Sequence, residues 1–293
     1  MNCGFLLLDK PETWTTFDLI RDLRKKSRLK KFGHMGTLDP FATGLVIVAL
    51  DKATRLTPLL IGKDKEYLVE IELGTRTDTG DNTGEVVESR MMKPLSKDLL
   101  ELTAREMLDI REQIPPLYSA VKVSGKPAYK LARAGESAEL KKREIKIHSF
   151  EILEANDKEI RYRTKVSKGT YIRTLSETFA EKLGTVAFTK KLRRLAIGES
   201  RVTAAVRPEK IDQDNWLDNI LPVEDILSDI PRIFLTREEA LSFQHGNRIM
   251  TSALPPGDNV LVFSWDNDFS GQKQLLGWGV FKDKILYPRR VLI

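Results

Sequence analysis

The loop of residues 33–40 presents one carboxylate, Asp39, in a setting that suits nucleophilic or electrostatic chemistry. Because a proline disfavours helical dihedral angles in the residue before it, Pro40 holds Asp39 on an extended, restrained backbone. Glycines around the loop, including Gly36 and Gly44, allow backbone or ligand to approach closely. An aspartate that is ionised at neutral pH can attack without further activation. An Asp-Pro pair is nonetheless most often a simple turn, so the loop by itself leaves both interpretations open.

The cysteine, the histidines and a triplet resembling a protease motif do not support a disulfide, a zinc site or an aspartic-protease site. The single cysteine, Cys3, cannot form an intrachain disulfide. The histidines lie far apart and lack the spacing of zinc ligands; they are His34, His148 and His245. The triplet at residues 78–80 resembles that of aspartic proteases, but its flanks are polar and it has no second copy, so a turn is the better interpretation. We therefore expect no metal site built from these residues.

Basic residues outnumber acidic ones and gather near predicted loops. The chain of 293 residues has 48 lysines and arginines against 42 acidic residues, which gives a net charge of +6. The basic clusters lie within residues 21–31, 122–146, 161–173 and 190–194. A single basic run is usually a solvated surface, but several clusters beside loops favour contact with phosphates. We therefore expect a nucleic acid as partner.

The hydrophobic content predicts a folded chain that does not enter a membrane. With 41% hydrophobic residues, the chain can bury a sizeable core in one large domain or two unequal ones. No apolar run reaches the length of a membrane span, and the first run meets Asp9 and Lys10 too soon for a secretory signal. We expect a cytoplasmic protein without a membrane partner.

Apolar patterns predict the strands that must position Asp39. Residues 44–50 follow the loop and are apolar on both faces, which indicates a central strand. Residues 65–73 alternate and place Tyr67 on their apolar face. Residues 145–153 and 160–166 alternate as well and could pair as a hairpin.

Two amphipathic stretches predict helices beside these strands. Thr15 or Thr16 can cap the first helix, whose buried face is expected to hold Phe17, Ile20 and Leu23. The second helix stops naturally at Gly184. Its apolar positions are Tyr171, Leu175, Phe179 and Leu183.

Changes in composition divide the chain into two unequal parts. Residues 114–143 contain little core material but many cations and two tyrosines, which predicts a surface insertion. After an acidic, broken stretch near residue 205, a fresh apolar start at residue 233 precedes a capping box of Thr236 and Glu239. We expect a domain of residues 1–230 that carries the chemistry and a small β-rich domain of residues 231–293.

The string GHMGTLDPFATGL at residues 33–45 resembles the signature of the bacterial tRNA pseudouridine synthases that act on uridine 55 of the T loop. Further stretches look like motifs of that family in the expected order, and ordered matches are much harder to obtain by chance than one short pattern. They are Lys10-Pro11, Lys65-Glu66-Tyr67 and residues 74–79, 114–122, 167–173 and 192–195. One departure is Met35, where the family has smaller or hydroxylated residues.

The resemblance implies an α+β pseudouridine synthase fold with a central mixed, mostly antiparallel sheet and a small PUA-like β-rich domain at the carboxyl end. It implies an enzyme that isomerises uridine to pseudouridine in tRNA without a cofactor or a metal. The base must be flipped out of its folded loop into a pocket, which costs about a few kcal/mol. A relative that modifies another RNA, and a non-catalytic RNA-binding or tRNA-folding protein on the same scaffold, remain as alternatives.

The resemblance also implies roles for individual residues. Asp39 matches the catalytic nucleophile, Arg173 the arginine that pairs with it, and Tyr67 the tyrosine that packs against the target base. Core packing for Tyr67 and a phosphate contact for Arg173 stay open as simpler roles. Substrate contacts are implied for His34, Tyr171, Leu192, Lys10, Lys122, Lys126 and Lys130. The insertion of residues 114–143 would close on the T-stem-loop of tRNA, bound by a monomer without a guide RNA.

Overall fold

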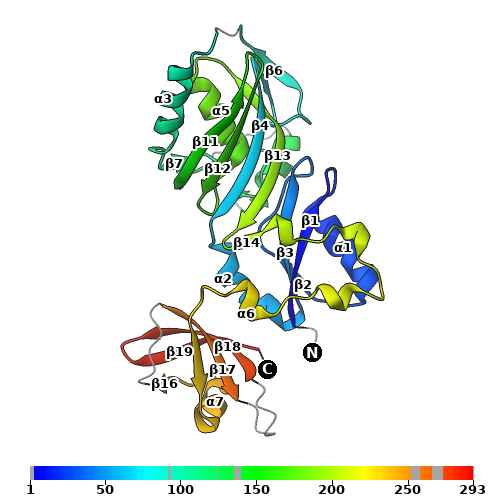
Figure 1. The fold of residues 1–293 in the computed structure, drawn as a ribbon, viewed down its shortest axis with the longest axis vertical. Coiled ribbons are helices and arrows are strands. Elements are labelled where there is room, and N and C mark those ends of the chain that lie inside the picture. Colours follow the sequence, from blue (N-terminus) through cyan, green and yellow to red (C-terminus); the bar gives the residue numbers. More distant parts are fainter. Residues whose placement is uncertain are drawn as a thin grey trace.

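A large mixed sheet forms the centre of the molecule, with its strands in the order β1-β3-β13-β4-β12-β11 (Figure 1). The computed structural model describes residues 3–91, 94–123, 125–134, 140–251, 258–265 and 273–292. Along this path only β13 and β3 run parallel, and every other neighbouring pair is antiparallel. This confirms the mixed, mostly antiparallel sheet that we predicted. The strands are β1 (Gly4–Lys10), β2 (Phe32–His34), β3 (Thr43–Leu50), β4 (Lys65–Leu73), β11 (Ile147–Ala155), β12 (Glu159–Val166), β13 (Ala187–Ile197) and β14 (Ser200–Arg201).

The strand patterns of the sequence are found in the sheet. β3 is buried over all but its first residue, as expected for a strand with two covered faces. β4 alternates strictly between buried and half-buried residues, with Tyr67 on the buried side. β11 and β12 pair as the predicted hairpin. Short two-stranded pairs accompany the sheet in the described part of the chain: β5 (Thr75–Thr77) with β6 (Val86–Ser89), β7 (Glu112–Gln113) with β10 (Arg143–Glu144), and β8 (Lys122–Val123) with β9 (Lys126–Pro127).

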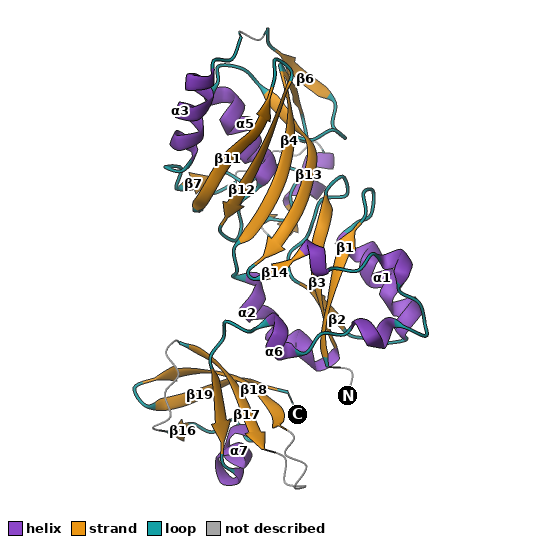
Figure 2. Ribbon diagram, viewed as in Figure 1, coloured by secondary structure: helices purple, strands orange, loops and turns teal. Residues whose placement is uncertain are grey.

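Helices cover the sheet unevenly. Helices α3 and α5 lie against the part of the sheet formed by β13, β4, β12 and β11, and α1 lies beside β1 and β3 at the other end (Figures 1 and 2). The α-helices are α1 (Thr16–Ser27), α2 (Thr57–Ile61), α3 (Lys97–Met107), α4 (Ala128–Arg133), α5 (Ile172–Lys182), α6 (Val223–Ile226) and α7 (Arg237–Gln244). Short 3₁₀ helices are η1 (Asp51–Leu56), η2 (Val202–Ala204), η3 (Pro208–Lys210) and η4 (Trp216–Asn219).

The first helix begins as predicted but buries a different face. Thr15 caps it through a capping box with Asp18, which satisfies backbone donors that the first turn leaves open. The buried positions are Thr16, Leu19, Ile20 and Leu23. The prediction for Phe17 was wrong: it is 58% exposed, because the helical period that buries residues 16, 19, 20 and 23 turns residue 17 outward. The guanidinium of Arg21 covers its ring at 5.6 Å.

A second sheet follows the acidic stretch and contains five strands in the order β15-β17-β18-β19-β16. Their bounds are β15 (Arg232–Leu235), β16 (Ile249–Met250), β17 (Asn259–Trp265), β18 (Lys273–Lys282) and β19 (Ile285–Val291). Helix α7 starts with the predicted capping box of Thr236 and Glu239 and packs on this sheet. Through Leu261 and Phe263 the sheet also joins a hydrophobic cluster that includes residues of β1 and β3.

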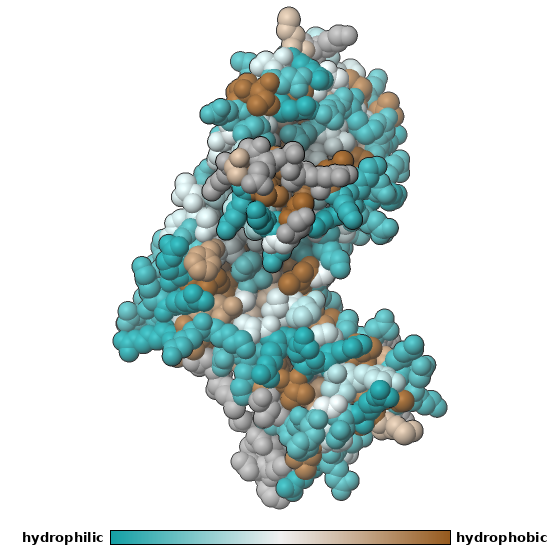
Figure 3. Space-filling view, turned by 180° about the vertical axis from the view of Figure 1, so that it is seen from behind, coloured by the Kyte–Doolittle hydropathy of each residue, from teal (hydrophilic) through white to brown (hydrophobic). Residues whose placement is uncertain are grey.

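The outer surface is mostly polar. On the face in Figure 3, hydrophilic side chains dominate and the hydrophobic ones form small separate patches among the described residues. Within the described part of the chain, no helix is both long enough and apolar enough to cross a membrane.

The close approach of β3 and β13 at Gly44 allows a test of how these strands pack. Gly44 has a φ of +105°, and a Cβ there would lie 2.3 Å from the carbonyl oxygen of Arg194 on β13. Gly44→Ala is therefore expected to lower the free energy of unfolding by about 3 kcal/mol or more, since it combines backbone strain with a clash that neither strand can relieve. Urea denaturation measures this change. Gly62→Ala is the control, because Gly62 has a negative φ and open space around it; equal effects of the two substitutions would contradict the packing argument.

Candidate active site

An ion pair joins Asp39, in the loop before β3, to Arg173 of α5. Arg173 Nε lies 3.0 Å from Asp39 Oδ2, and the arginine side chain is 4% exposed whereas that of the aspartate is 36% exposed. Arg173 is the second residue of α5, and its side chain emerges from the first helical turn. The carboxylate therefore faces solvent on one side and a fixed, buried cation on the other. This is the contact that the sequence resemblance implied.

The guanidinium of Arg173 is held by partners from two other segments. Its Nη1 donates to the carbonyl oxygen of Thr79 at 2.6 Å and lies 3.3 Å from Oδ2 of Asp81. Its Nη2 donates to the carbonyl oxygen of Tyr118 at 2.8 Å. Since the planar fork of arginine meets acceptors on all its sides, Arg173 cannot swing away from Asp39. The contact with Tyr118 brings the insertion of residues 114–143 directly to the site.

Asp81 belongs to the site although its sequence pattern indicated only a turn. Its residue is 5% exposed, and its Oδ1 accepts hydrogen bonds from the backbone N–H of Thr83 and from the hydroxyls of Thr79 and Thr83. The predicted turn is therefore present, and its hydrogen bonds to Oδ1 orient the other carboxylate oxygen, Oδ2, toward Arg173. The sequence did indicate that this segment matters, because residues 74–79, just before Asp81, match a family motif. Composition alone could not reveal it, since turns rich in aspartate and threonine are common.

The electrostatic balance at Asp39 raises the pKa of its carboxyl from the ordinary 3.8. Burial is the largest cause, Arg173 acts against it, and the negative charge of Asp81 raises the pKa further. The folded protein therefore binds this proton more tightly than the unfolded chain does. Its contribution to stability is largest at low pH and declines as the pH rises through the folded pKa.

Asp81→Asn is expected to slow catalysis about ten- to a hundredfold and to move the acid limb of the rate to lower pH. The rate falls because Arg173 loses a partner that orients it. The limb moves because an anion that raises the pKa of Asp39 is gone. Single-turnover rates between pH 4.5 and 8 measure both effects. In the exposed control Asp109→Asn, rate and limb should stay unchanged; a limb in Asp81→Asn that stays in place or moves upward would contradict this balance.

Lys10 supports the Asp39 loop from within the core. Its residue is 0% exposed, and its Nζ donates to the carbonyl oxygens of Pro11, Trp14 and Pro40 at 2.9, 2.6 and 3.2 Å. All three N–H groups of the ammonium thus have acceptors within the protein, and the contact of Lys10 with RNA stays a prediction. Burial lowers the pKa of Lys10 to about 8, against the attraction of Asp39.

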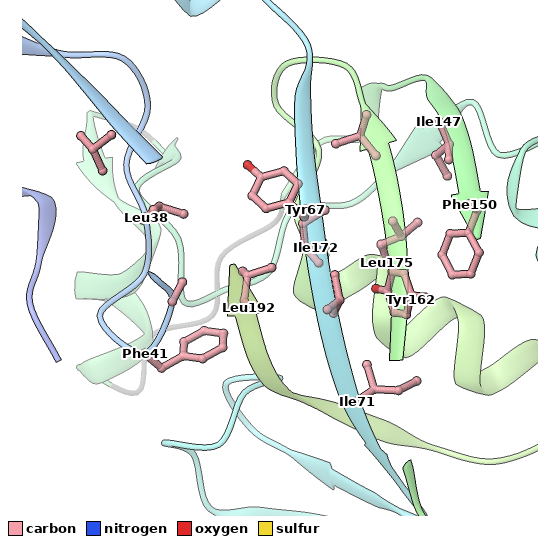
Figure 4. Packing of buried hydrophobic residues seen from close by; sticks show 14 of the residues in the cluster. Leu38, Phe41, Tyr67, Ile71, Ile147, Phe150, Tyr162, Ile172, Leu175 and Leu192 are labelled. Atoms are coloured by element: carbon pink, nitrogen blue, oxygen red, sulfur yellow. The ribbon is translucent and has the colours of Figure 1, made fainter. Parts of the chain in front are cut away.

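An apolar wall stands beside the carboxylate. Figure 4 shows Tyr67 extending from β4 toward the loop that carries Leu38 and Phe41, with Leu192 of β13 next to Phe41. Tyr67, Leu192 and Phe41 are 8%, 6% and 6% exposed. A cavity of about 380 Å³ is lined by Phe41 and Leu192 together with further residues of β4, β12 and β13. Tyr67 and Leu192 thus lie in one hydrophobic cluster with Leu38 and Phe41, the residues that flank the Asp39-Pro40 pair in the chain.

Tyr171 enters the site through its backbone. It is the N-cap of α5, and its N–H donates to Oε1 of Gln113 while its carbonyl accepts from Nε2 of the same side chain, at 2.8 and 3.0 Å. Gln113 is 8% exposed and closes this double contact from β7. It fixes the turn that leads into Arg173. Sequence reasoning missed Gln113, because nothing local marks a glutamine as the partner of a backbone 58 residues away.

His34 ends β2 just before the loop and is half-buried, with a buried Nδ1 that has no hydrogen-bond partner in the described part of the chain. Burial is the largest cause of a lowered pKa at His34, and the nearby charge of Arg194 lowers it further. Met35 is 0% exposed and packs with Leu45 and Ile47. The side chain that departs from the family pattern therefore lies in the core and is not part of the outer surface of the loop.

The basic clusters differ in how far their cations are exposed to solvent or engaged in ion pairs within the protein. Lys122, Lys126 and Lys130 of the insertion are exposed, on β8, β9 and α4. The fourth cluster is different from what we predicted, because its cations are engaged within the protein. Lys190 pairs with Glu72 and Glu159, Lys191 with Glu70, and Arg193 with Asp9, whereas Arg194 is buried. Because side chains alternate along β13, the charges of this cluster lie on both faces of the strand, and a run of basic residues in the sequence does not show this.

Comparison with known proteins decides the family. Residues 24–172 match the model of the TruB family of pseudouridylate synthases, in its N-terminal domain. The chain is 36% identical to tRNA pseudouridine synthase B of Aquifex aeolicus over 293 residues, which cover 99% of both chains. The chain belongs to this family. A second relative, tRNA pseudouridine synthase B of Ralstonia pickettii, is also 36% identical and covers 99% of this chain and 94% of its own. Membership makes the chain an isomerase rather than a non-catalytic binding protein.

Solved structures confirm the fold of the TruB-family chain. A chain in an H/ACA ribonucleoprotein bound to a substrate RNA superposes with a TM-score of 0.70 at 21% identity, over 100% of this chain and 86% of that one. A chain in an archaeal box H/ACA complex gives a TM-score of 0.69 at 20% identity, over 99% of this chain and 86% of that one. At this identity the likeness concerns the fold alone.

Proposed function

We propose that this protein converts the uridine at position 55 in the T loop of tRNA to pseudouridine, with Asp39 as the nucleophile. The observation that carries the proposal is the pair of Asp39 and Arg173, in which a half-exposed carboxylate is held by a buried cation beside an apolar wall. The relatives named tRNA pseudouridine synthase B support tRNA as the substrate.

The reaction requires little beyond these groups. The bond from C1′ of the ribose to N1 of uracil breaks, a bond from C1′ to C5 forms, the proton on C5 leaves, and N1 ends protonated. No electrons are gained or lost overall, so no redox cofactor or energy source enters the balance. Asp39 supplies the nucleophile, Arg173 keeps its carboxylate oriented, and Tyr67 with Leu192 flanks the flipped base. Tyr171 lies close to this pocket through the turn before α5.

The remaining residues suit a grip on a folded RNA. Lys122, Lys126 and Lys130 are exposed on an insertion whose Tyr118 carbonyl touches Arg173, so RNA contact and the catalytic centre are linked. His34 borders the Asp39 loop and is placed to contact the nucleotides around the target base. Residues 1–230 form the catalytic domain and residues 231–293 a small domain that adds to RNA binding. The protein acts as a cytoplasmic monomer on tRNA alone, without a guide RNA.

An unmodified tRNA transcript tests this function directly. We expect one pseudouridine at position 55 after incubation with the purified protein, mapped by chemical labelling of pseudouridine. A transcript with cytidine at position 55 is the matched control and should remain unmodified. Product at another position would show a relative with a different target, and no product with several tRNAs and folded protein would refute the proposal.

Charge reversal of the insertion should weaken RNA binding. In the triple variant Lys122→Glu, Lys126→Glu, Lys130→Glu, we expect a higher Kd for tRNA and a flatter dependence of log Kd on log salt. Each phosphate contact that is lost reduces that slope by about 0.7 to 0.9. Filter binding between 50 and 300 mM salt measures it. Reversal of the exposed Lys97, Lys158 and Lys210 is the control, and equal slopes in the two triple variants would place the RNA elsewhere.

A further inference from the structure

The guanidinium of Arg194 lies inside the protein without a carboxylate beside it. The residue is 1% exposed and is the bulkiest of the fully buried side chains. Among the described residues, no ion pair includes it. Its Nε donates to the carbonyl oxygen of Leu45 at 2.7 Å, and its Nη2 donates to that of Gly36 at 3.1 Å. A buried cation with only neutral acceptors is costly, which points to a role that a neutral side chain would not fill.

The two carbonyl acceptors of Arg194 bracket the catalytic loop. Gly36 lies before Asp39 and Leu45 lies after it, so one side chain ties both ends of the loop to β13. In the antiparallel pair of β13 and β4, Arg194 is directly opposite Tyr67. Burial lowers the pKa of Arg194, and the hydroxyl of Tyr67 acts against that shift, which places the phenol beside the guanidinium.

We propose that Arg194 is a positioning residue that holds the Asp39 loop in fixed register with Tyr67. The proposal rests on the proposed roles of Asp39 and Tyr67 and adds the element that joins them. Arginine suits this place because its rigid planar fork donates to two carbonyls in different directions while it lies beside the phenol of Tyr67. A lysine would keep the charge but could not meet both carbonyls in the same geometry. The loop would then keep its fold but lose its exact distance to β4.

The experiment compares Arg194→Lys with wild type in single-turnover pseudouridine formation on a tRNA transcript. We expect a rate about ten- to a hundredfold lower, since misplacement of a reacting group by about 1 Å has effects of this size. The Kd for tRNA should change less than about threefold, because Arg194 is buried and does not meet RNA. Arg201→Lys is the control, as Arg201 is exposed on β14 and should leave the rate unchanged.

A double-mutant cycle with Tyr67→Phe separates positioning from general stability. If Arg194 acts through Tyr67, the two substitutions together slow the reaction by less than the product of their separate effects. The proposal would be overturned if the effects of the two substitutions on the rate simply multiplied, or if Arg194→Lys left the rate unchanged. It would also be overturned if the loss of rate in Arg194→Lys were fully accounted for by a smaller folded fraction, measured by thermal unfolding. A wild-type protein that makes no pseudouridine would instead refute the proposed function, so the two failures are distinct.

Discussion

Asp39→Asn is expected to abolish pseudouridine formation, by at least about four orders of magnitude in single-turnover rate, while tRNA binding persists. Asparagine has nearly the same shape as aspartate, so the loop and its neighbours can remain in place. Its amide oxygen can still accept from Arg173, but the amide is not a nucleophile that can attack the nucleotide. Rate and Kd are measured on the same transcript, by formation of pseudouridine in the RNA and by filter binding.

A matched control and a second outcome make this result informative. Asp157→Asn changes an exposed aspartate in the turn between β11 and β12 and should leave both rate and Kd unchanged. If Asp39→Asn lost tRNA binding and thermal stability in the same proportion as rate, Asp39 would be a structural residue. Because the raised pKa means that the fold disfavours the ionised carboxylate, replacement by neutral asparagine predicts the opposite, a small gain in stability at neutral pH.

Arg173→Lys is expected to lower the single-turnover rate at least about a hundredfold with little change in tRNA binding. The side chain of Arg173 meets Asp39, Asp81 and two backbone carbonyls at once. A lysine ammonium keeps the charge near Asp39 but cannot reach all of these acceptors from one rigid plane. The carboxylate would then adopt several orientations, of which few suit attack.

The rate at saturating tRNA separates this effect from weaker binding. Arg105→Lys on α3 is an exposed arginine-to-lysine control and should behave as wild type. A variant that binds tRNA poorly but reacts normally once bound would assign Arg173 to phosphate contact, which the sequence left open. Addition of guanidinium ion to Arg173→Lys offers a further readout, because partial recovery of rate would show that the missing group is the planar cation.

Much of the fold can be predicted from local patterns in the chain. The apolar run of β3, the alternation of β4 and the two capping boxes at Thr15 and Thr236 each depend on residues a few positions apart. Such patterns show which face of an element is buried, and their period distinguishes a helix from a strand. Phe17 shows the limit of this reasoning, since an aromatic residue at the margin of an apolar face is buried only if a neighbour covers it.

The sequence by itself determined that Asp39 stands in a restrained loop with the motifs of a pseudouridine synthase, and it placed Arg173 and Tyr67 on the elements that flank it. Only the tertiary structure decided which partners complete the site: Asp81 behind Arg173, Gln113 under Tyr171, and Arg194 between the loop and β4. The physical reason is that these contacts join segments far apart in the chain. Their geometry depends on how the strands cross and on which buried polar groups must find a partner, and neither is written in local periodicity.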